Sequence, residues 1–158
     1  MIIRKVKKEE IPLLAAIWLD VSTTAHHFIS PHYWAENHAQ MVENYLPNSE
    51  VYVAEIEQEV HGFIALVNDY LSALFVVNEQ QGKGIGRALL EFAKTNHPEL
   101  FLRVYQKNEK SVQFYIANGF QIVAETKDAA TNENEFEMHW RKCLTKGEMN
   151  CKMEEKKL

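Results

Sequence analysis

The chain has 158 residues, 46% of them hydrophobic and 25% charged, which suits a single globular domain with a core of its own. A net charge of −5 argues against nucleic acid as the main partner, and no apolar run is long enough to span a membrane. The charged first ten residues do not read as a signal peptide, and Cys143 and Cys151 lie too near the C-terminus for a disulfide framework, so we expect a cytoplasmic protein.

Eleven helices and strands are expected along the chain, in the order β-α-α-β-β-β-α-β-α-β-β. In chain order they are a strand at 1–6, helices at 9–22 and 31–46, strands at 50–56, 60–69 and 70–77, a helix from the glycine-rich turn to 97, a strand at 100–105, a helix at 108–118, and strands at 121–126 and 135–140. The segment 23–29 interrupts the helical period. The chain is therefore predicted to be one α+β domain, with about seven strands in a central mixed sheet and four flanking helices.

Several residues mark where the predicted helices begin and end. Ser30 is expected to cap the second helix, with Pro31 in its first position. Asn108 is expected to cap the last helix, and Gly119 to follow that helix in the left-handed conformation. Residues 143–158 carry few apolar side chains, so we predict a charged, disordered tail that leaves residues 1–142 as the domain.

Three glycines within five residues, Gly82, Gly84 and Gly86, separate the apolar strand from its helix. Bare amides at the positive end of a helix favour an anion such as a pyrophosphate, and Lys83 and Arg87 add positive charge at the rim. The spacing fits neither the dinucleotide-binding G-x-G-x-x-G pattern nor a P-loop. A tight strand-to-helix connection without a ligand is the alternative interpretation.

Gln81, Gly84 and Gly86 form the pattern Q-x-x-G-x-G, and the segment NEKSVQFYIANGF follows at residues 108–120. In this order and spacing they resemble the two signature segments of the GCN5-related N-acetyltransferases, of which the second reads N-x-x-(A/S)-x-x-x-Y-x-x-x-G-F. The resemblance covers residues 1–142 and is closest to small stand-alone bacterial members, some of which acetylate protein lysines. It implies a mostly antiparallel sheet that splays between its fourth and fifth strands, and acetyl-CoA as co-substrate.

The resemblance implies direct attack of a primary amine on acetyl-CoA, with Tyr115 as the general acid for the departing thiolate. Packing on the inner face of its helix is the alternative for Tyr115, and a solvated position is the alternative for Ser111. The residues implied to bind acetyl-CoA, through backbone, amide or side-chain groups, are Leu74, Phe75, Val76, Gln81, Gly82, Lys83, Gly84, Ile85, Gly86, Arg87, Asn108 and Ser111.

His26, Phe28 and Tyr70 are the residues implied to bind the amine acceptor, although an ordinary polar loop is the alternative for His26. The general base is not specified, because the central strand carries no carboxylate, and Asp69, His26 and a water relay all stay open. We expect His26 to contribute little to the rate. No metal site is expected, since no carboxylate or thiolate joins the histidines at a ligand spacing.

Three functions stay open for such a chain. The first is acetylation of a protein or peptide amine, which is the prediction preferred here. The second is acetylation of a small amine, and the third is an acyl-CoA-binding sensor without chemistry, against which the intact Tyr115 argues. The sequence does not distinguish a monomer from a homodimer.

Overall fold

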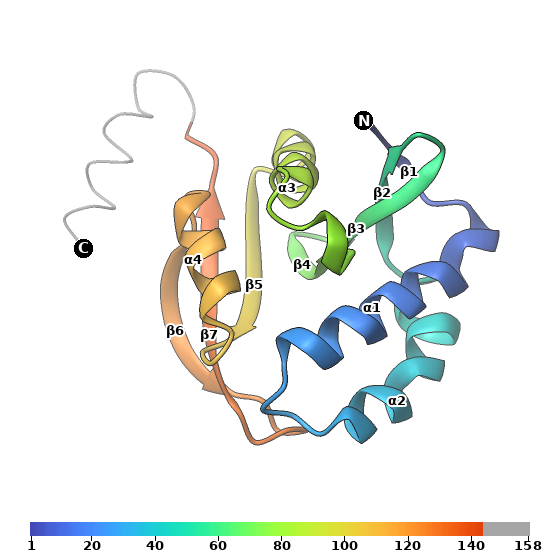
Figure 1. Ribbon diagram of the computed structural model, residues 1–158. Helices are drawn as coiled ribbons and strands as arrows, with labels where there is room; N and C mark the ends of the chain where they lie inside the picture. Colours follow the sequence, from blue (N-terminus) through green and yellow to red (C-terminus); the bar gives the residue numbers. More distant parts are fainter. Residues whose placement is uncertain (144–158) are drawn as a thin grey trace.

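The computed structural model describes residues 1–143, and within them the helices and strands follow the predicted order (Figure 1). The elements are β1 (Ile2–Lys5), α1 (Ile11–Ala25), α2 (Pro31–Gln40), β2 (Glu50–Ile56), β3 (Glu59–Val67), β4 (Tyr70–Val76), α3 (Ile85–Asn96), β5 (Glu99–Tyr105), α4 (Glu109–Ala117), β6 (Gln121–Lys127) and β7 (Asn134–Arg141). Short 3-10 turns precede α1 and follow β4, and a π-helical turn extends α2. Beyond its first residue, the predicted tail lies outside the described residues.

The strands form one sheet in the order β1-β2-β3-β4-β5-β7-β6. All neighbouring pairs are antiparallel except β4 and β5, which are parallel and pair only where Tyr70 lies opposite Phe101. Beyond that pair the two strands diverge, which divides the sheet into two parts (Figure 1). This confirms the mixed, mostly antiparallel sheet that splays between its fourth and fifth strands.

Two hydrophobic cores lie on the two faces of the sheet, because successive strand residues point to opposite sides. Phe63 and Ala65 of β3 face the core formed with α1 and α2, whereas Ile64 and Leu66 face the core formed with α3 and α4. All four side chains are almost completely buried. Burial of a large apolar side chain contributes about 1.5–3 kcal/mol, so this alternation fixes the register of the central strands.

Helix α1 extends three residues further than the sequence predicts. The hydroxyl groups of Thr23 and Thr24 donate to the carbonyl oxygens of Leu19 and Asp20, at 2.7 and 3.2 Å. Both hydroxyl groups thus find their hydrogen-bond acceptors within the helix. The prediction that the helical period breaks at residue 23 was therefore wrong. The consequence is that His26, the first residue after the helix, lies at its C-terminal end.

The predicted helix caps are confirmed. The Ser30 hydroxyl accepts a hydrogen bond from the His32 amide at 3.3 Å, and the Asn108 side-chain oxygen accepts one from the Ser111 amide at 3.2 Å. Gly119 has φ +92°, as expected after the end of α4. Among residues 1–143, no helix is long and apolar enough to cross a membrane.

Candidate active site

A cleft of about 610 Å³ opens where β4 and β5 diverge, and it extends from the N-terminus of α3 to the C-terminus of α1. It brings together most of the residues predicted from the sequence. Those that line it are Tyr70, Leu74, Phe75, Val76, Gln81, Gly82, Gly84, Ile85, Gly86, Arg87, Asn108, Ser111, Tyr115 and His26. Lys83 and Phe28 are not among the lining residues.

The cleft wall contributed by β4 is a strand with one free side. From Leu74 to Val76 the strand pairs with β3 alone, because β5 has already turned away. Alternate backbone N–H and C=O groups of such a strand point into the cleft. An extended ligand with amide groups can pair with them as an additional strand would.

The glycine-rich turn forms the end of the cleft at α3. Gly82 and Gly84 have φ of +78° and +87°, and a Cβ atom at either position would meet nothing within 4 Å. Gly84 is the N-cap of α3, whose first backbone hydrogen bond runs from the Ala88 amide to the Gly84 carbonyl at 3.0 Å. The amides of the first turn, including Ile85 and Gly86, therefore have no partner within the helix and can bind an anion.

Polar side chains tie this turn to its surroundings. The Gln81 side-chain nitrogen Nε2 donates to the Val76 carbonyl at 3.0 Å, and the side-chain oxygen Oε1 accepts from Lys110 at 3.1 Å. Lys110, in the first turn of α4, thus adds a cation to the cleft that the sequence analysis missed. Lys83 lies outside the cleft lining and donates to Gln80 at 3.2 Å.

Tyr115 projects from the inner face of α4, where its side chain is 8% exposed and packs against the rings of Phe114 and Phe120. Its hydroxyl forms no hydrogen bond with any of the described residues. Burial, followed by the negative charge of an ionised Tyr70, raises the pKa of Tyr115 well above that of a free tyrosine. The phenol is therefore protonated at neutral pH.

His26 connects the end of α1 to the cap of α4. Its Nε2 lies 3.1 Å from the side-chain nitrogen of Asn108, which can only donate, so Nε2 accepts this hydrogen bond. Burial lowers the pKa of His26 to about 4, and the imidazole is neutral at pH 7. The proton then resides on Nδ1, which is buried without a partner in the described part of the chain. Since the Nε2 lone pair is engaged by Asn108, His26 is poorly placed to accept a proton from a substrate.

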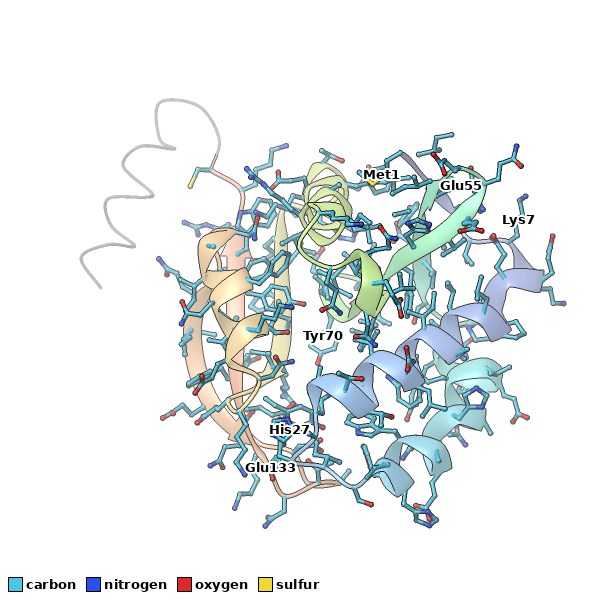
Figure 2. All side chains as sticks on the ribbon, in the orientation of Figure 1. Met1, Lys7, His27, Glu55, Tyr70 and Glu133 are labelled. Carbon is cyan, nitrogen blue, oxygen red and sulfur yellow. The ribbon has the colours of Figure 1, made fainter. Side chains whose placement is uncertain are left out.

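The other residues predicted at the acceptor end occupy different positions. Tyr70 is 40% exposed at the point where β4 and β5 meet, and Figure 2 shows it between the two parts of the sheet. Phe28 packs against the ring of Tyr105 and under Lys107, beside the cleft lining. Asp69, one of the candidate bases, lies 3.1 Å from His97 and does not line the cleft.

Besides Lys110, the cleft contains Arg103, Tyr105 and Glu135, which were not predicted from the sequence. Arg103 and Tyr105 come from β5, and Glu135 comes from β7, in register with Tyr105. The Tyr105 hydroxyl donates to Asp128 at 2.7 Å. The sequence pattern did not indicate these residues, because hydrophobic periodicity does not reveal that β7 lies next to β5 in the sheet. Within residues 1–143, no three His, Cys, Asp or Glu side chains are grouped so as to hold a metal ion.

Known proteins resemble this chain over most of its length. The model of the acetyltransferase (GNAT) domain family matches residues 47–122. The peptidyl-lysine N-acetyltransferase YiaC of Escherichia coli is 36% identical over 122 residues, which cover 77% of this chain and 84% of that protein. The peptidyl-lysine N-acetyltransferase YjaB of the same organism is 35% identical over 127 residues, which cover 79% and 85%. The solution structure of apo YjaB matches with a TM-score of 0.78 and 30% identity, covering 89% of this chain and 98% of that one.

Proposed function

Because this chain belongs to the GCN5-related N-acetyltransferase (GNAT) family and is an acetyl-CoA-dependent N-acetyltransferase, we propose that its acceptor is the side-chain amine of a lysine in a protein or peptide. Two relatives named peptidyl-lysine N-acetyltransferases, each at least 35% identical to this chain, support this acceptor class. The observation that supports the mechanism is Tyr115, a buried phenol that lines the cleft beginning at the glycine-rich turn. We further propose that the enzyme acts in the cytoplasm, as a monomer or homodimer.

The residues of the cleft divide the binding of acetyl-CoA between them. In this proposal the amides from Gly82 to Arg87 bind the pyrophosphate, with Lys110 and Arg87 supplying positive charge. The free side of β4, from Leu74 to Val76, pairs with the amide groups of pantetheine. The thioester then lies deeper in the cleft, within reach of Tyr115.

Tyr115 acts at the step in which the carbon–sulfur bond breaks. The amine lone pair attacks the thioester carbonyl carbon, and the electrons of the carbon–sulfur bond leave with the sulfur. The Tyr115 hydroxyl supplies the proton that converts the departing thiolate into a thiol. Because burial disfavours the phenolate, proton return to Tyr115 after the step is favourable.

The acceptor class is tested by steady-state kinetics with the purified chain. Acetyl-CoA is offered with lysine-containing peptides, with the same peptides carrying arginine instead of lysine, and with small amines such as spermidine and an aminoglycoside. The expected result is thiol release with the lysine peptides alone, and mass spectrometry that places one acetyl group on the lysine side chain. A higher kcat/KM for a small amine than for every peptide would replace the proposed acceptor, and binding of acetyl-CoA without turnover of any amine would identify a sensor.

A further inference from the structure

One carboxylate lines the cleft among the residues that the structure describes, and it belongs to Glu135 of β7. Strand β7 pairs with β5, and Glu135 lies directly opposite Tyr105. Its neighbour Phe136 packs into the core under α3 and α4, so Glu135 points to the other face, toward α1 and α2. The carboxylate thus lies on the face of the sheet that also carries Tyr105 and Phe28.

The carboxylate of Glu135 is unpaired, unlike those of Asp128 and Glu133. Asp128 accepts hydrogen bonds from Tyr105 and Thr131, and Glu133 forms an ion pair with Lys107 at 3.2 Å. By contrast, the side-chain oxygens of Glu135 form no hydrogen bond or ion pair within residues 1–143, and the Gln106 side chain donates to its backbone carbonyl instead, at 3.3 Å. The cleft therefore contains a negative group that no cation of the described chain contacts.

The surroundings of Glu135 make it suited to hold a proton. Burial, and then the charge of Asp128, raises its pKa above that of a free glutamic acid, whereas Arg103 acts in the opposite direction. Tyr70 interacts electrostatically with Glu135, Glu137 and Asp128, and also with Tyr115. The carboxylate and the proposed acid are thus both neighbours of Tyr70, one on β7 and the other on α4.

We propose that Glu135 binds the ammonium group of the acceptor amine in the cleft and takes up its first proton. This inference rests on the proposed N-acetyltransferase function. A lysine amine has a pKa of about 10.4, so only about one molecule in a few thousand is neutral at pH 7. A group in the cleft must both attract the cation and remove its proton before the nitrogen can attack. Asp69 is paired with His97 outside the cleft and the His26 lone pair is engaged by Asn108, so neither is free for this role.

The protons of the reaction balance in this scheme. The acceptor R–NH₃⁺ transfers one proton to the Glu135 carboxylate and becomes R–NH₂, whose lone pair forms the bond to the acetyl carbon. Tyr115 protonates the sulfur as the carbon–sulfur bond breaks. The new amide nitrogen loses a second proton, which restores the Tyr115 hydroxyl, and Glu135 releases the first proton to solvent. One proton is released per turnover, together with one thiol and one acetamide.

The test compares Glu135→Gln with Glu137→Gln, a matched control that removes the same charge. Glu137 lies two residues further along the same face of β7, opposite Arg103, and does not line the cleft. With a lysine peptide, Glu135→Gln should lower kcat/KM by about 100-fold or more, the usual scale for loss of a general base. Glu137→Gln should stay within about threefold of the parent, as expected of a charge outside the site. Acetyl-CoA affinity should be unchanged in both variants.

A second acceptor separates this role from a structural one. In a peptide that carries an aminooxy group in place of the lysine amine, the nucleophile is already neutral at pH 7, so the loss caused by Glu135→Gln should shrink to a few-fold. Glu135→Asp, which keeps the charge, should recover part of the activity toward lysine and serves if the Gln variant does not fold. If wild-type enzyme prefers a small amine, the proposed acceptor class fails, and the same variants are compared with that amine.

Three results would each overturn the inference. The first is a kcat/KM for Glu135→Gln within about threefold of wild type on the preferred amine, and the second is an equal loss in Glu137→Gln. The third is an undiminished loss with the aminooxy acceptor. Each of these results requires that the wild-type enzyme turns over an amine. If the wild type turned over no amine, the proposed function itself would fail, so the two kinds of failure are distinguishable.

Discussion

Replacing Tyr115 with phenylalanine removes one oxygen atom from the cleft and leaves the packing of α4 in place. The ring is 8% exposed and keeps its contacts with Phe114 and Phe120, and the lost hydroxyl has no hydrogen-bond partner among the described residues. The free energy of unfolding should therefore change by less than about 1 kcal/mol. Any large change in rate then reports on chemistry.

The rate should fall by the amount that a general acid contributes. General acid catalysis is worth about 10²–10⁴-fold, which corresponds to about 2.7–5.4 kcal/mol of transition-state stabilisation. We expect kcat for Tyr115→Phe to fall by this factor while acetyl-CoA affinity is unchanged, since the glycine-rich turn and β4 are untouched. Because burial raises the pKa of Tyr115, the phenol of the wild type stays protonated through neutral and mildly basic pH, so the deficit should persist across that range.

Thiol release under saturating acetyl-CoA measures kcat, and calorimetry measures acetyl-CoA binding. Tyr45→Phe is the matched control, because it removes the same oxygen from a tyrosine that is 55% exposed and does not line the cleft. If Tyr115→Phe keeps kcat within a few-fold of Tyr45→Phe, Tyr115 is a packing residue and the assignment of the acid is refuted.

Two further predictions concern the ends of the cleft. Gly84→Asp places a negative charge where the pyrophosphate is proposed to bind. Measured by calorimetry, it should weaken acetyl-CoA binding by about 30-fold or more relative to Gly84→Asn. The Asn variant is the control, because its side chain has the same size and its backbone the same unfavourable φ of +87°. Equal affinities for the two variants would argue against an anion at this turn. Burial lowers the pKa of His26 to about 4, whereas in the unfolded chain this histidine takes up its proton near pH 6.5. Acid therefore favours the unfolded chain. Between pH 7 and 4, the free energy of unfolding of the wild type should drop by up to about 3 kcal/mol more than that of His26→Gln. Urea unfolding at several pH values measures this, and parallel pH profiles would contradict it.

Local signals in the sequence were sufficient for the elements and for most residues that line the cleft at the glycine-rich turn, although Lys110 was missed and Lys83 lies outside the lining. The helix caps at Ser30 and Asn108 each depend on a side chain two or three residues from its partner amide, so the sequence pattern alone indicates them. The glycine-rich turn is equally local, because Gly82 and Gly84 need positive φ whatever the rest of the chain does. The limit of helix α1 was missed because threonines can hydrogen-bond within a helix as well as interrupt one.

The acceptor end depends on contacts between residues distant in sequence. Asn108 was predicted as a cap, but its second contact, with His26, joins residues 82 positions apart. At the other end of the cleft, Lys110 contacts Gln81 across 29 positions. Such contacts follow from the sheet order, which hydrophobic periodicity does not encode, and so Glu135 could not be placed at the cleft from its position in the sequence.

The position of β7 explains how one cleft can carry the proposed acid and the proposed base on different walls. Strand β7 lies between β5 and β6, so the residues of β7 that face α1 and α2 extend the wall formed by Arg103 and Tyr105. Tyr115, in contrast, comes from α4 and packs into the core on the opposite face. The cleft between the diverging β4 and β5 is open to both faces of the sheet, and Glu135 and Tyr115 both line it. In the proposed scheme, the proton taken from the amine and the proton given to the sulfur thus belong to separate groups, Glu135 on β7 and Tyr115 on α4.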